Sequence, residues 1–164
     1  MASSSWLPAP LARLDPLIIG WMRRYGPPVL HVGLAIIFIW FGALKLWAVS
    51  PADELVRRTI YWVSPDFFMP VLGLWEIAIG VCLAFPRLLR VGIALLFLQM
   101  PGTFLPMVLL PEVCWVSFPF VLTMEGQYIV KNLVIIGAAL VLGGQLHRAQ
   151  SAFTPAAAAC PVKI

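Results

Sequence analysis

Charged residues are scarce in this chain. Asp, Glu, Lys and Arg make up 11% of its 164 residues, whereas hydrophobic residues make up 62%. A soluble domain of this length cannot hide so much apolar surface, because its own core is too small to hold it. The composition therefore excludes a soluble enzyme or a soluble binding domain. It predicts one integral membrane domain whose first partner is the lipid bilayer.

Cysteine is also rare, and its three copies are Cys82, Cys114 and Cys160. None lies in a Cys-x-x-Cys pair, so we expect neither a zinc site nor a thioredoxin-like redox motif. The sequence likewise has no hydrolytic triad motif and no glycine-rich phosphate loop. We therefore expect no metal site, no catalytic residue and no catalytic activity from this chain alone.

Acidic residues are fewer than basic ones, and the formal net charge is +4. A nucleic-acid-binding protein gathers its Lys and Arg residues on one face, whereas here they are scattered among apolar segments. We therefore expect no nucleic-acid partner.

The chain contains four long apolar segments, at residues 29–48, 67–85, 88–110 and 127–146. A helix of about 20 residues rises roughly 30 Å, which is enough to cross the hydrocarbon core of a bilayer. The predicted fold is all-α, an integral membrane four-helix bundle formed by residues 29–146. We expect a tail at residues 147–164 on the same side as the N-terminus.

Short amphipathic helices are expected at the membrane interface. The first lies within a cytoplasmic N-terminal segment, residues 1–28, begins at Asp15 and is ended by Gly26-Pro27-Pro28. The second follows the first span, with Ser50 as its predicted cap, and runs to about Val63.

Residues 111–123, between the third and fourth spans, are too apolar for an ordinary solvated loop. Irregular backbone at membrane depth is tolerated where protein covers it or where it faces a wet cavity. We interpret this stretch as interfacial or partly re-entrant.

The distribution of Lys and Arg predicts the orientation. With four spans, both termini and the second connection share one side, and cytoplasmic connections are enriched in basic residues. We therefore expect both termini in the cytoplasm. Seven of the eleven basic residues fall on that side, two on the other and two within spans: Arg13, Arg23, Arg24, Arg87, Arg90, Arg148 and Lys163, then Arg57 and Arg58, then Lys45 and Lys131.

Small residues recur at a spacing of seven, or two helical turns, in three of the four spans. Such residues let helix backbones approach closely inside a membrane. We predict helix packing along the faces that carry Ala35 and Gly42, Gly73 and Gly80, and Gly137 and Gly144.

Five polar residues fall within the spans or at their ends: Lys45, Glu76, Gln99, Glu125 and Lys131. A charge near the bilayer centre costs about 2.5 kcal/mol or more on insertion scales, so it is expected to face protein and to find a partner. With the orientation above, these residues gather in the outer half of the bundle.

Several roles are open to this group. Lys45 and Lys131 can reach the outer headgroups as ordinary snorkelling lysines. Glu76, which is central and short, either is protonated or pairs with one of the lysines. Such a pair can be a structural clasp, part of a proton path or the polar end of a ligand pocket, and Gln99 either extends it or simply bonds two helices together.

His31 and His147 lie at the cytoplasmic ends of the first and fourth spans. Two histidines on facing helices can ligate a haem iron. Their terminal placement favours ordinary interfacial histidines, so haem is the weaker interpretation.

Three short motifs resemble the DoxX family of small bacterial four-helix membrane proteins, over about residues 29–144. They are Phe41-Gly42-Ala43-Leu44-Lys45, then Gly73-Leu74-Trp75-Glu76 with Gly80, and Glu125-Gly126-Gln127-Tyr128-Ile129-Val130-Lys131-Asn132. The family takes its name from a subunit associated with thiosulfate:quinone oxidoreduction, and other members are linked to redox or thiol-stress complexes.

The resemblance implies a multi-pass protein of the bacterial inner membrane, with Lys45, Glu76 and Lys131 at the matching polar positions. It predicts an accessory subunit of a redox or energy-transducing complex, one that works with other membrane subunits and lines a quinone site; any activity would belong to a quinone-linked oxidoreductase. The alternatives are a small proton-coupled transporter or channel that uses Glu76, and a purely structural assembly subunit.

Overall fold

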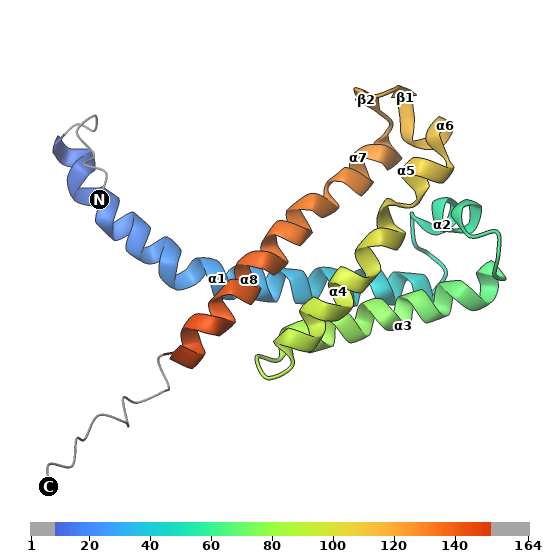
Figure 1. The fold of residues 1–164 in the computed structure, drawn as a ribbon. Helices are drawn as coiled ribbons and strands as arrows, with labels where there is room; N and C mark the ends of the chain where they lie inside the picture. The colour runs from blue at the N-terminus through green and yellow to red at the C-terminus, as the bar shows by residue number, and fades with distance from the viewer. Residues whose placement is uncertain (1–8, 152–164) are drawn as a thin grey trace, which may run out of the picture.

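The computed structural model describes the backbone of residues 9–151 and the side chains of residues 14–146. Four of its helical segments are long and apolar enough to cross a membrane. The predicted all-α fold is confirmed, and the chain is a multi-pass membrane protein built on a four-helix bundle (Figure 1). The four segments are Leu14–Leu46, Pro65–Ala84, Leu89–Leu109 and Met124–Leu146.

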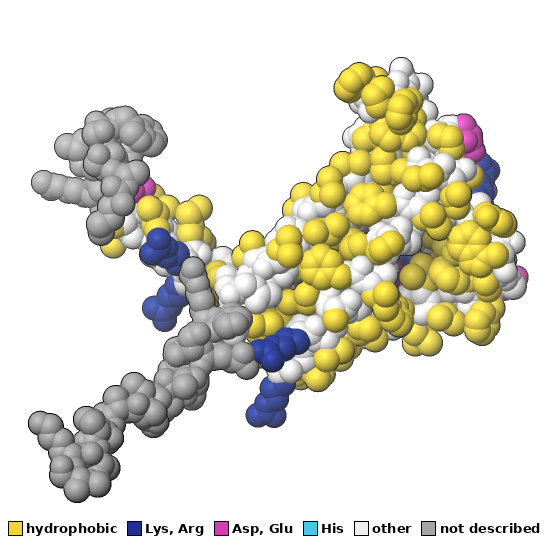
Figure 2. Space-filling model, in the orientation of Figure 1, with side chains coloured by type: hydrophobic (Ala, Val, Ile, Leu, Met, Phe, Trp, Pro, Cys, Tyr) yellow, Lys and Arg dark blue, Asp and Glu magenta, His cyan; other side chains and the backbone are white. Residues whose placement is uncertain are grey.

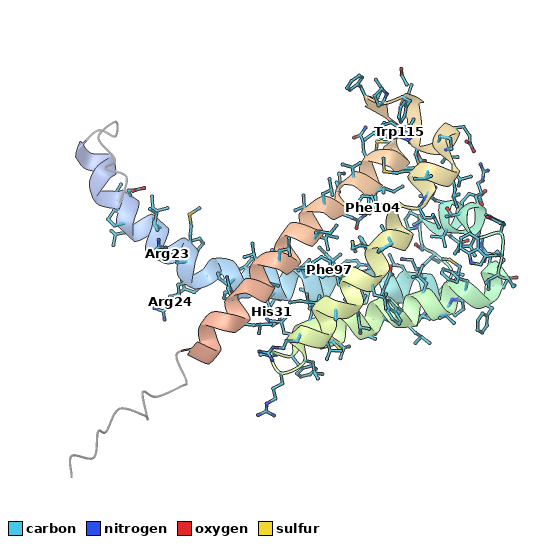
Figure 3. All side chains as sticks on the ribbon, in the orientation of Figure 1. Arg23, Arg24, His31, Phe97, Phe104 and Trp115 are labelled. Atoms are coloured by element: carbon cyan, nitrogen blue, oxygen red, sulfur yellow. The ribbon has the colours of Figure 1, made fainter. Side chains whose placement is uncertain are left out.

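The first helix, α1 (Ala9–Leu46), is continuous across Pro16, Pro27 and Pro28. The prediction that Gly26-Pro27-Pro28 ends a separate interfacial helix is therefore wrong. Each proline removes one backbone hydrogen bond and bends a helix without having to break it, and membrane helices tolerate this well. α1 accordingly bends in its N-terminal part (Figure 1), and Arg23 and Arg24 lie on that part (Figure 3).

The closest helix contact joins α1 to α3 (Pro65–Ala84) through small residues. A β-carbon placed on Gly42 would lie 2.5 Å from the carbonyl oxygen of Gly73, and one placed on Gly80 would lie 2.8 Å from that of Ala35. Real β-carbons do not approach oxygen so closely, so the two backbones meet here only because the side chains are absent. Both predicted small-residue faces on α1 and α3 take part in this contact.

The predicted third face does not behave in the same way. A β-carbon on Gly137 or Gly144 would meet no described atom within 4 Å. The helix that carries them, α8 (Asn132–Ser151), packs instead through Ala138, Ala139 and Leu142. The rotation of α8 about its own axis decides which of its residues face inward. A spacing of seven places two residues on one face but does not show which way that face points.

The core lies where α1, α3, α4 (Leu89–Phe104) and α8 meet. Apolar side chains are common on the outside as well, since Figure 2 shows hydrophobic side chains spread over this face of the bundle and charged ones mainly toward its edges. A surface of this kind is matched to lipid tails and not to water. The buried core residues are Leu34, Ala35, Phe38, Ile79, Leu83, Leu89, Leu96, Met100, Ala138, Ala139 and Leu142.

A short helix, α2 (Asp53–Thr59), joins α1 to α3. It ends before Val63, and Ser50 is not its N-cap, because Ala52 takes that position. The α2 residue Arg57 bonds Asp53 within the helix at 2.6 Å and Asp66 at the start of α3 at 2.8 Å.

The connection between α4 and the last span consists of short elements. α5 (Pro106–Leu109) belongs to the end of the third span, and α7 (Met124–Val130) belongs to the start of the fourth. Between them lie α6 (Pro111–Cys114), β1 (Trp115–Ser117) and β2 (Val121–Leu122), and β1 pairs with β2 in an antiparallel hairpin. The hairpin, which contains Trp115, lies at one end of the bundle and does not enter between the helices (Figures 1 and 3). An interfacial position fits this placement better than a re-entrant one.

The α1–α3 contact can be tested with two matched glycine substitutions. We expect Gly42→Ala to destabilise the detergent-solubilised protein by about 1–3 kcal/mol, because the new methyl group overpacks the contact. Gly137→Ala is the control in open space, and it should be neutral or slightly stabilising because Ala is the better helix former. Thermal or denaturant unfolding monitored by circular dichroism measures both. Equal effects of the two changes would contradict the proposed close approach.

Candidate ligand site

Three helices bring one polar cluster together inside the bundle. The Lys45 ammonium on α1 bonds Glu76 Oε2 on α3 at 2.6 Å, and the Gln99 amide on α4 donates to Glu76 Oε1 at 2.9 Å. Lys45 and Glu76 are 8% and 7% exposed, and among the described residues they are the charged groups that are buried. The structure thus brings together Lys45, Glu76 and Gln99, three of the five polar residues predicted for the cluster.

The small-residue contact explains why these side chains meet. A β-carbon on Gly73 would lie 3.2 Å from Cβ of Lys45, so the lysine stem crosses α3 at the place where α3 has no side chain. Glu76 comes three residues after Gly73 and therefore lies on the same helical face. The lysine head then reaches the carboxylate one turn along α3.

A buried ion pair is costly to form but even more costly to break. Desolvation of both charges offsets much of their attraction, and removal of one partner leaves an unpaired charge that costs about 3–5 kcal/mol. Gln99 reduces the desolvation cost of the pair by donating to Oε1, the carboxylate oxygen of Glu76 that Lys45 does not bond. Lys45 also lies in the last turn of α1, where the helix dipole favours a cation.

The cluster forms the polar floor of a cavity of about 640 Å³. The cavity lies between the C-terminal end of α1, α2, α3, α4, α5 and α7, and its opening appears as a hollow in the hydrophobic surface (Figure 2). Most of its lining is apolar. Aromatic rings are prominent among the lining residues, which include Phe41, Trp62, Phe68, Trp75 and Tyr128.

The other two residues predicted for the cluster lie outside it. Glu125 lines the cavity but is exposed and makes no direct bond to the Lys45–Glu76 pair in the described structure. Lys131 does not line the cavity. It sits at the break between α7 and α8, is exposed, and its ammonium lies 5.4 Å from the ring centre of Tyr128.

Asn132 takes the place that was predicted for Lys131. It lines the cavity and donates to the Ile129 carbonyl at 2.9 Å, so its amide is held by the end of α7. The sequence did not single it out, because the side that faces inward changes where α7 gives way to α8. The contribution of α2, through residues such as Leu55 and Thr59, was also missed, since an interfacial helix was expected to lie away from the site.

The described structure offers no further support for haem or a metal. His31 is partly buried, and its Nε2 atom has no hydrogen-bond partner among the described residues. The side chain of His147 lies outside the residues whose side chains are described. No group of three or more His, Cys, Asp or Glu side chains that could hold a metal occurs in the described part of the chain.

Cys114, in α6 and outside the spans, is fully buried. Burial raises the pKa of the Cys114 thiol, and the nearby charges of Glu125 and Glu112 raise it further. A raised pKa keeps the group as an unreactive thiol at neutral pH. Cys114 is therefore suited to packing and not to sulfur chemistry.

The coupling of the ion pair can be measured with charge-removing substitutions of similar shape. We expect Lys45→Met and Glu76→Gln each to destabilise the protein by up to about 3–5 kcal/mol, because each leaves one buried charge unpaired. The double variant removes both charges and should lie closer to the native protein than either single variant. The free energy of unfolding in detergent is measured for the native protein, both single variants and the double variant. Strictly additive effects of the two substitutions would contradict a coupled pair.

Comparisons of the chain with protein-family models, with curated proteins and with solved structures found no match. The structural features that bear on function are the cavity and the three polar side chains at its floor.

Proposed function

We propose that the protein is an accessory membrane subunit of a redox or energy-transducing complex and that its cavity binds a quinone. The observation that carries this proposal is the Lys45 ammonium, a buried hydrogen-bond donor at the floor of a largely apolar cavity. An ammonium group has three hydrogens. One of them is directed at Glu76, which leaves donor capacity for a ligand.

A quinone matches this donor well. It presents two carbonyl acceptors on a flat, apolar ring, and most small-molecule sites combine apolar walls with a few placed polar groups. The aromatic lining suits a flat ring, which can stack on it, and a volume of about 640 Å³ is in the range of ordinary ligand cavities. The surrounding hydrophobic surface suits an isoprenoid tail that remains in the lipid.

The ion pair also suits a neutral ligand. Lys45 and Glu76 cancel each other's charge, so an uncharged head group can bind without leaving either charge unpaired. A strongly anionic head would have to compete with Glu76 for the lysine. The balance of charge at the floor thus favours a polar but uncharged molecule.

The wider setting follows from the sequence and is part of the proposal. The motifs quoted above support membership of the DoxX family, a place in the bacterial inner membrane and cytoplasmic termini. Membrane partners would supply or remove the electrons, since we assign no redox centre to this chain. The role of this subunit would be to hold the quinone and to anchor those partners through its lipid-facing helices.

Two lysines provide a matched test of the quinone site. We expect Lys45→Met to lower the quinone that co-purifies in mild detergent by about tenfold, the effect of losing one hydrogen bond to a charged donor. Lys131→Met changes a lysine outside the cavity and should leave the quinone content unchanged. Mass spectrometry of solvent extracts measures the quinone content. If the Lys45→Met protein unfolds, the double variant Lys45→Met/Glu76→Gln, which has no unpaired charge, repeats the test. Unchanged quinone in both Lys45 variants would contradict the site.

A second candidate is proton-coupled transport, which one observation favours. Glu76 is a carboxylate buried in a membrane-spanning helix, and it lines a cavity large enough for a substrate. Such residues often mark proton or substrate paths.

Flux assays separate the two candidates. If the protein transports, Glu76→Gln should abolish proton-driven uptake into proteoliposomes, because Gln cannot carry a proton, whereas Glu125→Gln at the rim should retain it. An accessory quinone subunit has no flux in the native protein. Absence of flux from native proteoliposomes that retain quinone would therefore exclude the transporter.

A further inference from the structure

Gln99 has an unusual hydrogen-bond balance. Its Nε2 atom donates to Glu76, but its Oε1 atom is buried and accepts no hydrogen bond from any described residue. The amide orientation follows from chemistry, since the reverse orientation would turn the amide oxygen toward a carboxylate oxygen. The unsatisfied group is therefore an acceptor, and a buried acceptor without a donor is costly.

The neighbouring side chains do not supply the missing donor. The Thr103 hydroxyl, one turn along α4, is directed at the Gln99 backbone carbonyl at 3.4 Å. The Asn132 amide donates to Tyr128 and Ile129, and the Thr59 hydroxyl donates to Leu55. These three groups line the cavity with their hydrogens already engaged by backbone oxygens.

We propose that Gln99 makes the cavity selective for a head group that carries a hydroxyl donor, and that within the quinone series it favours the reduced quinol over the quinone. The inference rests on the proposed quinone site. A quinone presents only acceptors, which Lys45 can satisfy. A quinol also presents hydroxyl hydrogens, one of which can satisfy Gln99.

The position of Gln99 allows this role. Its side chain lines the cavity, while Oε1 itself is covered by protein. The amide nitrogen has two hydrogens, so a pivot about Nε2 that turns the oxygen toward a bound head group can keep one N–H directed at Glu76. Glu76 has Lys45 as its other partner, and in this proposal the ligand hydroxyl takes the place of the protein atoms that cover Oε1.

The test compares three ligands of one shape on the native, detergent-solubilised protein under anaerobic conditions. They are a short-chain benzoquinone, its quinol and the dimethyl ether of that quinol, which keeps both oxygens but has no donor. We expect the quinol to bind about tenfold more tightly than the other two, because it alone satisfies the buried acceptor. Equilibrium dialysis with mass spectrometry measures all three affinities.

Substitutions then assign the preference to Gln99. Gln99→Met should weaken quinol binding to the level of the quinone, whereas Gln127→Met, at a glutamine that does not line the cavity, should leave the preference intact. A melting curve confirms that each variant is folded, and the preference of the native protein can be read without any variant.

Each outcome has one meaning. Equal binding of quinol, quinone and ether by the native protein overturns the selectivity while the quinone site stands. Equal weakening of all three ligands by Gln99→Met overturns the assignment to Gln99 and leaves it as a support for Glu76. Binding of none of the three overturns the proposed function, and the selectivity with it.

Discussion

The ion pair between Lys45 and Glu76 is the interaction on which the interior of this bundle depends. Both charges are buried, and each is tolerable there only because the other lies 2.6 Å away. The pair in turn needs two helix backbones close enough for a lysine to cross one helix and reach the next. Gly42 and Gly73 provide that approach, so a packing feature and an electrostatic one depend on each other.

The same geometry opens the cavity. α1 and α3 lie close along their small residues, whereas α4 and α7 contact the rest more sparsely and leave space beside the ion pair, which α2 closes on one side. A membrane protein gains little from filling every such space, because lipid tails are as apolar as its side chains. Such a space is therefore ordinary by itself. What bears on function is that two buried charges border it, since a purely structural ion pair would be better enclosed on all sides.

Sequence patterns predicted the parts of this structure that depend on composition and local spacing. Long apolar runs located the four spans, and the position of Glu76 one turn from Gly73 correctly predicted that it points into the bundle, although the spacing left its partner open between Lys45 and Lys131. Features that depend on helix rotation or long-range placement were missed. The Pro27-Pro28 pair predicted a break where α1 only bends, the face of α8 was misjudged at Gly137, and Lys131 was grouped with the cluster although Asn132, and not Lys131, lines the cavity. Each of these errors concerns either the continuation of a helix across a proline pair or the direction in which a helix face points, and local spacing determines neither.

The three polar residues at the floor of the cavity have different hydrogen-bonding roles, and the difference bears on function. Lys45 offers spare donors, Gln99 offers a spare acceptor, and Glu76 holds both in place with its two oxygens. Gln99 has a structural role as well, because its amide donates to the Glu76 oxygen that Lys45 does not bond. The same amide leaves a buried acceptor unmatched, which is a cost that a residue with only donor groups would not carry. A ligand that both accepts and donates removes the cost, and this is why we favour a binding role over a simple clasp.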